Sequence, residues 1–247
     1  MGITIDADID KDAFGAKKKF AVVSISSLKT FQGEAGMNQT LKNADTIPGA
    51  NTQPIINRLS RTIIRALDSS IHFTLLPENT VLTSKAYKNF TEDERVMRTL
   101  LISRPLNVAN NFKYVSDEQK FAKLAKDLGV DGVVGITMNF SISSGKNSGT
   151  AFESSSGKKS YGAVVSVSII AFNKDGKIIW KDSTLKETEP GNAKAVISID
   201  PSNMAGINLE KLHPAVIEMG EEAMDVLLAR LDYAMADKEP SGLQDAK

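Results

Sequence analysis

Residues 116–142 read SDEQKFAKLAKDLGVDGVVGITMNFSI, and this stretch decides the fold. Ser116 to Gln119 have the form of a capping box, and Gly129 supplies a left-handed stop, so a helix is predicted between them. Its apolar face consists of Phe121, Leu124, Ala125 and Leu128. A strand follows at once, because from Val134 to Ile142 large apolar residues alternate with small or polar ones. A helix that runs directly into a strand predicts an α/β domain.

Two more strands are predicted downstream. From Tyr161 to Ile169 apolar residues alternate with serine, and residues 173–176 (Asn-Lys-Asp-Gly) are a tight-turn signal before the returning strand Ile178 to Trp180. The segment Ser143 to Ser160 is rich in Ser, Gly and Lys and cannot bury much apolar surface, so we expect a mobile hairpin loop there. A helix that begins near Pro214 closes the pattern.

The first half of the chain supplies a strand and several helices. Phe20 to Ile25 is a short β-branched run typical of a buried strand, and a polar loop is expected from Lys29 to Ala50. Apolar residues at helical spacing between Ile55 and Leu67 predict an amphipathic helix with Pro54 in its first turn. Ile71 to Leu76 is predicted as a strand. One or two helices are expected over residues 80–103, with an end at Arg104-Pro105.

The predicted fold class is therefore α/β (α+β), with a single mixed sheet, an antiparallel C-terminal hairpin and helices packed against the sheet. We expect a flexible N-terminal arm (residues 1–17), one α/β domain (18–235) and a flexible C-terminal tail (236–247). No break in the pattern divides the central segment.

The amino-acid composition excludes several kinds of binding partner and chemistry. Thirty basic residues balance thirty acidic ones, so no net field attracts nucleic acid or an anionic membrane, and we expect no nucleic-acid partner. The absence of cysteine removes disulfides and thiolate chemistry. No run approaches the roughly 18 apolar residues that a membrane-spanning helix needs. Met1 to Asp6 lack the basic and apolar regions of a signal peptide, so we expect no targeting signal in this sequence.

Side chains that could perform chemistry are few. His72 and His213 are the only histidines, and each is interpreted as structural. The acidic residues of segments 92–94 and 221–222 are interpreted as solvated faces of helices. We therefore predict no catalytic, cofactor-binding or metal-binding residue, and no cofactor.

Three motif-like segments do not meet their requirements. Asp6, Asp8 and Asp10 are spaced like the start of a calcium loop, but Lys11 and Lys17 occupy the positions that need Gly and Glu. Residues 145–146 and 157–158 (Gly-Lys) lack the remainder of a phosphate loop, and the serines between 141 and 160 lack a nucleophile elbow.

Two segments resemble elements of a bacterial envelope group. This group includes the curli-secretion channel subunit, the amino-terminal domain of TolB and the lipoprotein activators of penicillin-binding proteins. Leu124 to Gly135 resembles the group's "helix, Gly-Ala-Asp, strand, Gly" element, and Val165 to Trp180 is similar to its "strand, Asp-x-x-Gly, Ile-Val-Trp" element. Phe20 to Val23 would be its opening strand. Pore formation is not expected, because Ser143 to Ser160 is too polar for a membrane hairpin.

The resemblance implies a non-catalytic protein-binding domain of a cell-envelope lipoprotein that acts in the assembly or regulation of another envelope protein. It implies a periplasmic or outer-membrane-anchored location, with contact to the membrane only through a removed lipid anchor. Two other hypotheses stay open, namely a carboxylate-based enzyme of glycan or small-molecule metabolism and a small-ligand-binding module. The sequence does not fix the oligomeric state.

Overall fold

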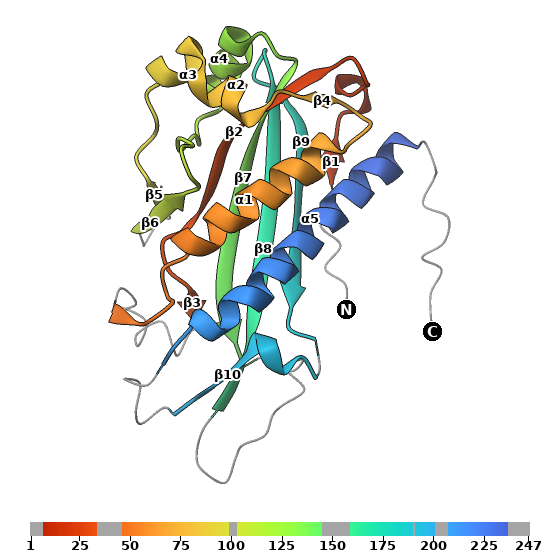
Figure 1. The fold of residues 1–247 in the computed structure, drawn as a ribbon. Coiled ribbons are helices and arrows are strands. Elements are labelled where there is room, and N and C mark those ends of the chain that lie inside the picture. Colours follow the sequence, from red (N-terminus) through yellow and green to blue (C-terminus); the bar gives the residue numbers. More distant parts are fainter. Residues whose placement is uncertain are drawn as a thin grey trace.

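The structure is a computed structural model that describes residues 7–33, 46–98, 103–144, 159–189, 191–200 and 207–236. A mixed sheet forms its centre (Figure 1). The strands are β1 (Asp8–Ile9), β2 (Lys19–Leu28), β3 (Gln32–Gly33), β4 (Thr74–Leu75), β5 (Val96–Arg98), β6 (Ser103–Val108), β7 (Gly132–Ser143), β8 (Lys159–Asn173), β9 (Ile178–Glu187) and β10 (Val196–Ile199). The helices are α1 (Gln53–Asp68), α2 (Glu78–Thr83), α3 (Lys85–Asn89), α4 (Glu118–Leu128) and α5 (His213–Met235).

The main path of the sheet runs in the order β1-β9-β8-β7-β2-β6-β5, and β3, β4 and β10 extend it. Strands β7, β8 and β9 form an antiparallel meander. Strand β2 lies parallel to β7, with Phe20 opposite Gly132 and Ser26 opposite Thr137. The predicted fold class is confirmed: one mixed, open sheet carries helices and ends in an antiparallel hairpin.

Helices α1 and α5 lie side by side across one face of the sheet, which we call the helix face (Figure 1). The apolar residues of β7, such as Ile136, Met138 and Phe140, are buried in the core. Leu59 of α1 lies against α5 at Gly220, where a Cβ atom would come within 2.8 Å of its Cδ1 atom. The predicted helices over 55–67 and from Pro214 onward are both confirmed.

Helix α4 covers one end of the opposite face. Its Phe121 stacks on Phe172 of β8, with ring centroids 4.9 Å apart. The N-cap is Asp117 rather than the expected Ser116, because the Asp117 carboxylate accepts a hydrogen bond from the Lys120 N–H. The left-handed stop at Gly129 is confirmed, with φ of 67°.

Two predictions in the first half need correction. The strand expected over Ile71 to Leu76 is reduced to the two residues of β4, and Ile71 is 78% exposed. The helices expected over 80–103 end at Asn89, and Arg104-Pro105 lies inside strand β6. Proline pushes the residue before it toward extended backbone, and a strand satisfies this restriction as well as a helix end does.

Part of the predicted N-terminal arm belongs to the sheet. Strand β1 pairs with β9, and Phe14 stacks on Phe20 with ring centroids 5.3 Å apart. The apolar side chains of Ile9 and Phe14 find partners in the core, so residues 8–14 are not a free arm. Most of the predicted loops at 29–50 and 143–160, and residues 237–247 of the predicted tail, lie outside the described residues.

Candidate functional site: the open face of the sheet

The face of the sheet opposite α1 and α5 carries polar side chains beyond the area that α4 covers. On β9, Asp182 and Lys186 form ion pairs with Arg230 and Glu222 of α5, so they point to the helix face. Ser183 and Leu185 point the other way, because side chains alternate along a strand. We call this second surface the open face, and Leu185 on it is 41% exposed.

A row of hydroxyl groups crosses the open face from strand to strand. The pairing register places Ser26, Thr137, Ser168 and Ser183 opposite one another on β2, β7, β8 and β9. The Oγ atom of Ser26 lies 3.5 Å from Oγ1 of Thr137. Neighbouring strands lie about 4.8 Å apart, so the row is about 14 Å long. It presents both hydrogen-bond donors and acceptors without net charge.

A hollow of about 440 Å³ lies beside this row. It is lined by Gly135, Thr137, Ser168, Ile170, Lys181 and Asp8, among others. Gly135 has no side chain, and the ring of Phe121 from α4 packs directly against it, so a Cβ atom there would come within 2.8 Å of the ring. Asp8 and Lys181 lie opposite each other on β1 and β9 and bring an acidic and a basic group to the hollow, which Asp182 also lines.

The edge of β9 next to this hollow is protected by side chains. Strand β1 pairs with β9 only at Trp180 and Lys181. Two residues after Lys181, the N–H group of Ser183 donates to Asp182 Oδ1 at 2.7 Å, and Arg230 Nη1 donates to the Ser183 carbonyl oxygen at 2.9 Å. Burial raises the pKa of Asp182 in spite of the Arg230 guanidinium beside it. These contacts satisfy backbone groups that a second strand would otherwise use.

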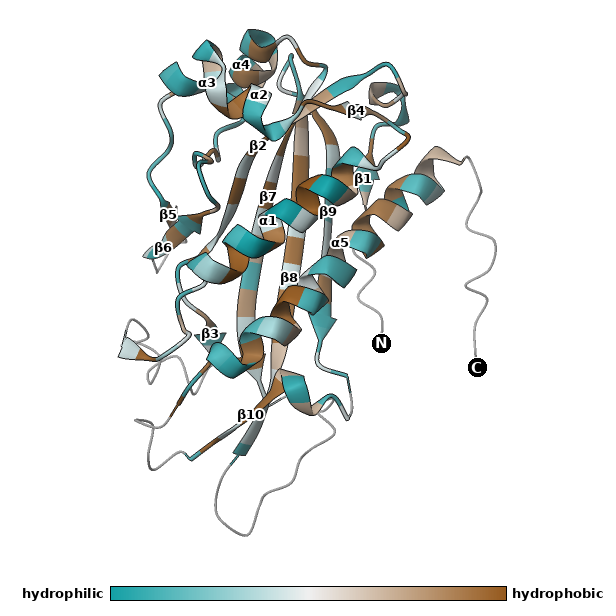
Figure 2. Ribbon diagram, viewed as in Figure 1, coloured by the Kyte–Doolittle hydropathy of each residue, from teal (hydrophilic) through white to brown (hydrophobic). Residues whose placement is uncertain are grey.

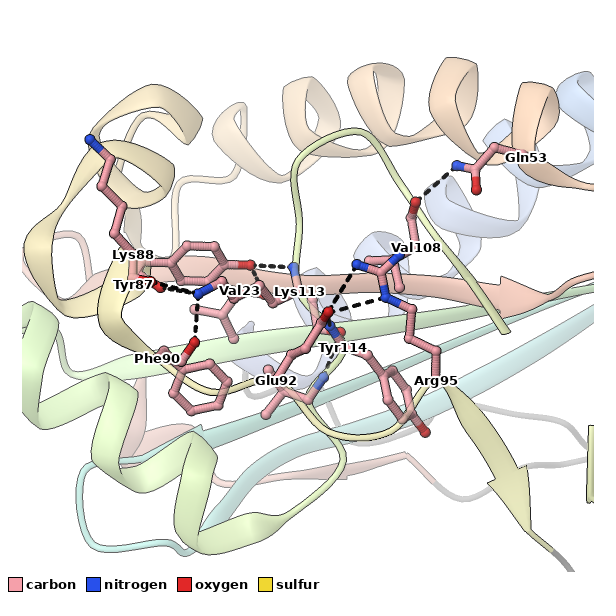
Figure 3. Close-up of polar contacts among 12 residues, drawn as sticks. Val23, Gln53, Tyr87, Lys88, Phe90, Glu92, Arg95, Val108, Lys113 and Tyr114 are labelled. Atoms are coloured by element: carbon pink, nitrogen blue, oxygen red, sulfur yellow. Dashed lines mark hydrogen bonds and ion pairs between the residues drawn. The ribbon is translucent and has the colours of Figure 1, made fainter. Parts of the chain in front are cut away.

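A second polar cluster joins α3 to the centre of the sheet (Figure 3). The Tyr87 hydroxyl donates to the carbonyl oxygen of Val23 at 2.7 Å, where the pairing of β2 with β7 shifts register, and burial raises the Tyr87 pKa. The Lys113 ammonium donates to the carbonyl oxygens of Tyr87, Lys88 and Phe90 near the end of α3. The C-terminal end of a helix carries partial negative charge, so the Lys113 ammonium at this end of α3 holds the helix in place.

The acidic segment 92–94 was predicted to lie on a helix, but the structure shows it as a loop that follows α3. Glu92 binds Arg95, and Glu94 binds Arg98. Burial alone would raise the pKa of Asp93, but hydrogen bonds from Lys120, Ser116 and Asp117 lower it overall. Asp93 therefore fastens the start of α4, and all three carboxylates lie among their own partners rather than in the hollow.

Both histidines lie at the ends of α5 rather than on the open face. His72 Nε2 is 2.8 Å from Asp232 Oδ1, and His213 Nε2 is 2.8 Å from the Gly49 carbonyl oxygen. The His213 ring also stacks on Phe31. Each imidazole thus has a partner that fixes its position, so the structure brings neither histidine to the serine and threonine hydroxyls.

Within the described ranges, no group of three or more His, Asp or Glu side chains is arranged to hold a metal ion. In the same part of the chain, no helix is both long enough and apolar enough to cross a membrane. Of the residues that sequence analysis considered for metal or phosphate binding, Asp10 binds Lys177 and lies in the turn before η1 (Lys11–Ala13). Asp6 and the two Gly-Lys pairs at 145–146 and 157–158 lie outside the described residues.

Comparisons with known proteins find likeness among solved structures alone. No family model matches the sequence, and no curated protein is similar to it. Among solved structures, the chain is similar to the LpoB C-terminal domain from Salmonella enterica, with a TM-score of 0.31 and 13% identity. The match covers 70% of this chain and 85% of that chain. A likeness at this level does not assign a function.

Proposed function

We propose that this chain is a non-catalytic protein-binding domain, the soluble part of a bacterial cell-envelope lipoprotein, and that it regulates or assembles another envelope protein. The observation that carries the proposal is the open face, where a row of hydroxyls crosses four paired strands beside the exposed Leu185. Ser26 at one end of the row is buried, and Thr137, Ser168 and Ser183 are partly exposed. A broad, uncharged surface with an apolar side chain suits contact with another protein. The resemblance of residues 124–135 and 165–180 to envelope proteins supports the location.

The neighbourhood of the hydroxyl row supports binding over group transfer. A serine or threonine nucleophile needs a base within hydrogen-bond reach. The two histidines are held at the ends of α5 by Asp232 and the Gly49 carbonyl. The Thr137 hydroxyl has the Ser26 hydroxyl as its neighbour, which is not a base at neutral pH.

The test is site-specific photo-crosslinking in the bacterium that encodes the chain. A photo-reactive residue at Ser168, on the open face, should crosslink to one envelope protein, and the same residue at Gln119 on α4 serves as the control. Adding Thr137→Arg should abolish the Ser168 adduct while the melting temperature stays unchanged, because the long cation blocks the surface. Equal adducts from both positions, or an adduct that survives Thr137→Arg, would contradict the proposal.

A small-ligand-binding module is the second candidate, because the hollow of about 440 Å³ combines hydroxyls with the Asp8 and Lys181 charges. Lys181→Met separates the two candidates. It should weaken small-ligand binding strongly, whereas it should leave the Ser168 crosslink in place. An enzyme is tested with His72→Gln and His213→Asn, which should keep full biological function; a folded variant that loses about a hundredfold in turnover would favour the enzyme.

A further inference from the structure

The outer surface of α1 carries a row of unpaired positive charge. Arg58, Arg61 and Arg65 are exposed and follow the spacing i, i+3, i+7, which places them on one line along the helix. Ile56 and Ile63, which are fully buried, lie on the other side of the helix. No described residue forms an ion pair with any of the three arginines. We call these three residues the basic stripe.

The neighbouring helix α5 carries the opposite charge at the same spacing. Glu218, Glu221 and Asp225 also follow i, i+3, i+7, and Glu218 and Asp225 are exposed. Within the described residues, ion pairs of α5 carboxylates are made by Glu222 and Asp232 instead. We call Glu218, Glu221 and Asp225 the acidic stripe. Figure 2 shows that hydrophilic segments alternate with hydrophobic ones along both helices.

The two stripes lie at the same level of the molecule. Helices α1 and α5 run in the same direction across the sheet (Figure 1), and Leu59 meets α5 at Gly220. Counted from this contact, Arg58, Arg61 and Arg65 lie at −1, +2 and +6 residues along α1. The acidic stripe lies at −2, +1 and +5 along α5. The levels thus differ by one residue throughout, which is about 1.5 Å of helix rise.

We propose that this chain forms a homodimer through α1 and α5, about a two-fold axis parallel to the two helices. Such an axis places α1 of one copy over α5 of the other at an unchanged level. The basic stripe of each copy then meets the acidic stripe of its partner, and both contacts form at once because the interface is isologous. A second copy is the partner that offers this spacing, this register and both signs of charge together.

Apolar groups at the end of the same helices add to the contact. A hollow of about 430 Å³ lies between the last turns of α1 and α5, lined by Ala66, Ile71, Leu228 and Met235, among others. Ile71 and Tyr233 are 78% and 42% exposed. Exposed ion pairs are individually weak and are screened by salt. The dimer is therefore reversible and salt-dependent. It leaves the open face free for the proposed envelope partner. The dimer proposal does not rest on the proposed function.

The test uses the full 247-residue chain in sedimentation experiments. The dimer should appear in about 20 mM salt and weaken at least about tenfold in about 500 mM salt. Two charge-reversal variants follow, and a third with the same change of net charge elsewhere is the control. The first variant reverses the basic stripe and combines Arg58→Glu, Arg61→Glu and Arg65→Glu. The second reverses the acidic stripe and combines Glu218→Lys, Glu221→Lys and Asp225→Lys. The control changes the net charge by the same amount as the first variant and combines Lys85→Glu, Lys88→Glu and Lys126→Glu.

Each stripe variant alone should be monomeric, an equal mixture of the two should form a heterodimer, and the control should dimerise like the unmodified chain. A stripe variant that does not fold is replaced by single cysteines, since the chain has none of its own. Arg61→Cys and Glu221→Cys chains should form a mixed disulfide faster than either forms its own. A monomer at every salt concentration, a dimer that survives reversal of one stripe, or a mixture that stays monomeric overturns the proposal.

Discussion

At the scale of single residues, the glycines of the α4–β7 junction have two different roles. A Cβ atom at Gly132 would lie 2.6 Å from the ring of Phe20. That ring is fully buried and packs against Phe14 and Phe73, with centroids 5.3 Å and 4.8 Å away, so it has no room to move. At Gly129 the space is open, but φ of 67° strains any other residue. One glycine is required for space, and the other is required for its backbone angle.

We therefore expect Gly132→Ala to lower the free energy of unfolding by about 1–3 kcal/mol through overpacking. Gly129→Ala should lower it by about 1 kcal/mol through left-handed strain. Urea denaturation of both variants checks the order, and an unchanged slope shows that the unfolded state is the same. A Gly132→Ala protein as stable as the unmodified chain would mean that Phe20 is free to shift.

At the scale of elements, the Asp182–Arg230 pair lies just beyond the point where β1 stops pairing with β9. Arg230 comes from α5 on the helix face, yet it reaches the backbone of Ser183 at the sheet edge. The pair therefore ties the last long helix to the edge strand. Because Asp182 is only 3% exposed, it depends on this guanidinium for compensation of its charge.

Arg230→Met should lower stability by roughly 3 kcal/mol at neutral pH, because it leaves a buried carboxylate without a counter-charge. Burial already raises the Asp182 pKa, so the folded state takes up a proton more readily than the unfolded state. The loss should therefore be largest at high pH and shrink as the pH falls toward that pKa. Adding Asp182→Asn should recover part of the loss at neutral pH. A loss in Arg230→Met that is independent of pH, measured by thermal unfolding, would contradict this role for Asp182.

At the scale of the whole molecule, we expect residues 18–235 to fold as one unit. The buried side chains of both halves belong to one cluster, and β2 of the first half lies between β7 and β6. Fragments 7–110 and 111–235, which keep β1 and Phe14 with the first half, should each lack a cooperative melting transition when made separately, and mixing them should restore it. A single fragment that unfolds cooperatively by circular dichroism would mean that the chain has two domains.

The helices and strands that depend on local sequence pattern were predictable from the sequence. The hydroxyl row on the open face was not. Apolar periodicity and Gly129 located α1, α4 and α5, since helix geometry acts over a few neighbouring residues. The hydroxyl row depends on the register of four strands, and residues as distant as Ser26 and Thr137 meet only through that register. The partners of Tyr87 and Asp93 are long-range contacts as well. The helix end predicted at Arg104-Pro105 was wrong, because a proline restricts the backbone angles of the residue before it but is compatible with both a helix end and a strand.

The parallel pairing of β2 with β7 also sets an order of events during synthesis. Strand β2 is made early, but its partner Thr137 follows Ser26 by 111 residues. The meander β7-β8-β9 has nearby partners and can assemble first. Contacts between distant segments slow folding, so we expect β2 to join the sheet after the meander has formed. Under the envelope location proposed above, the chain would cross a membrane before it folds, and this delay would favour export over premature folding.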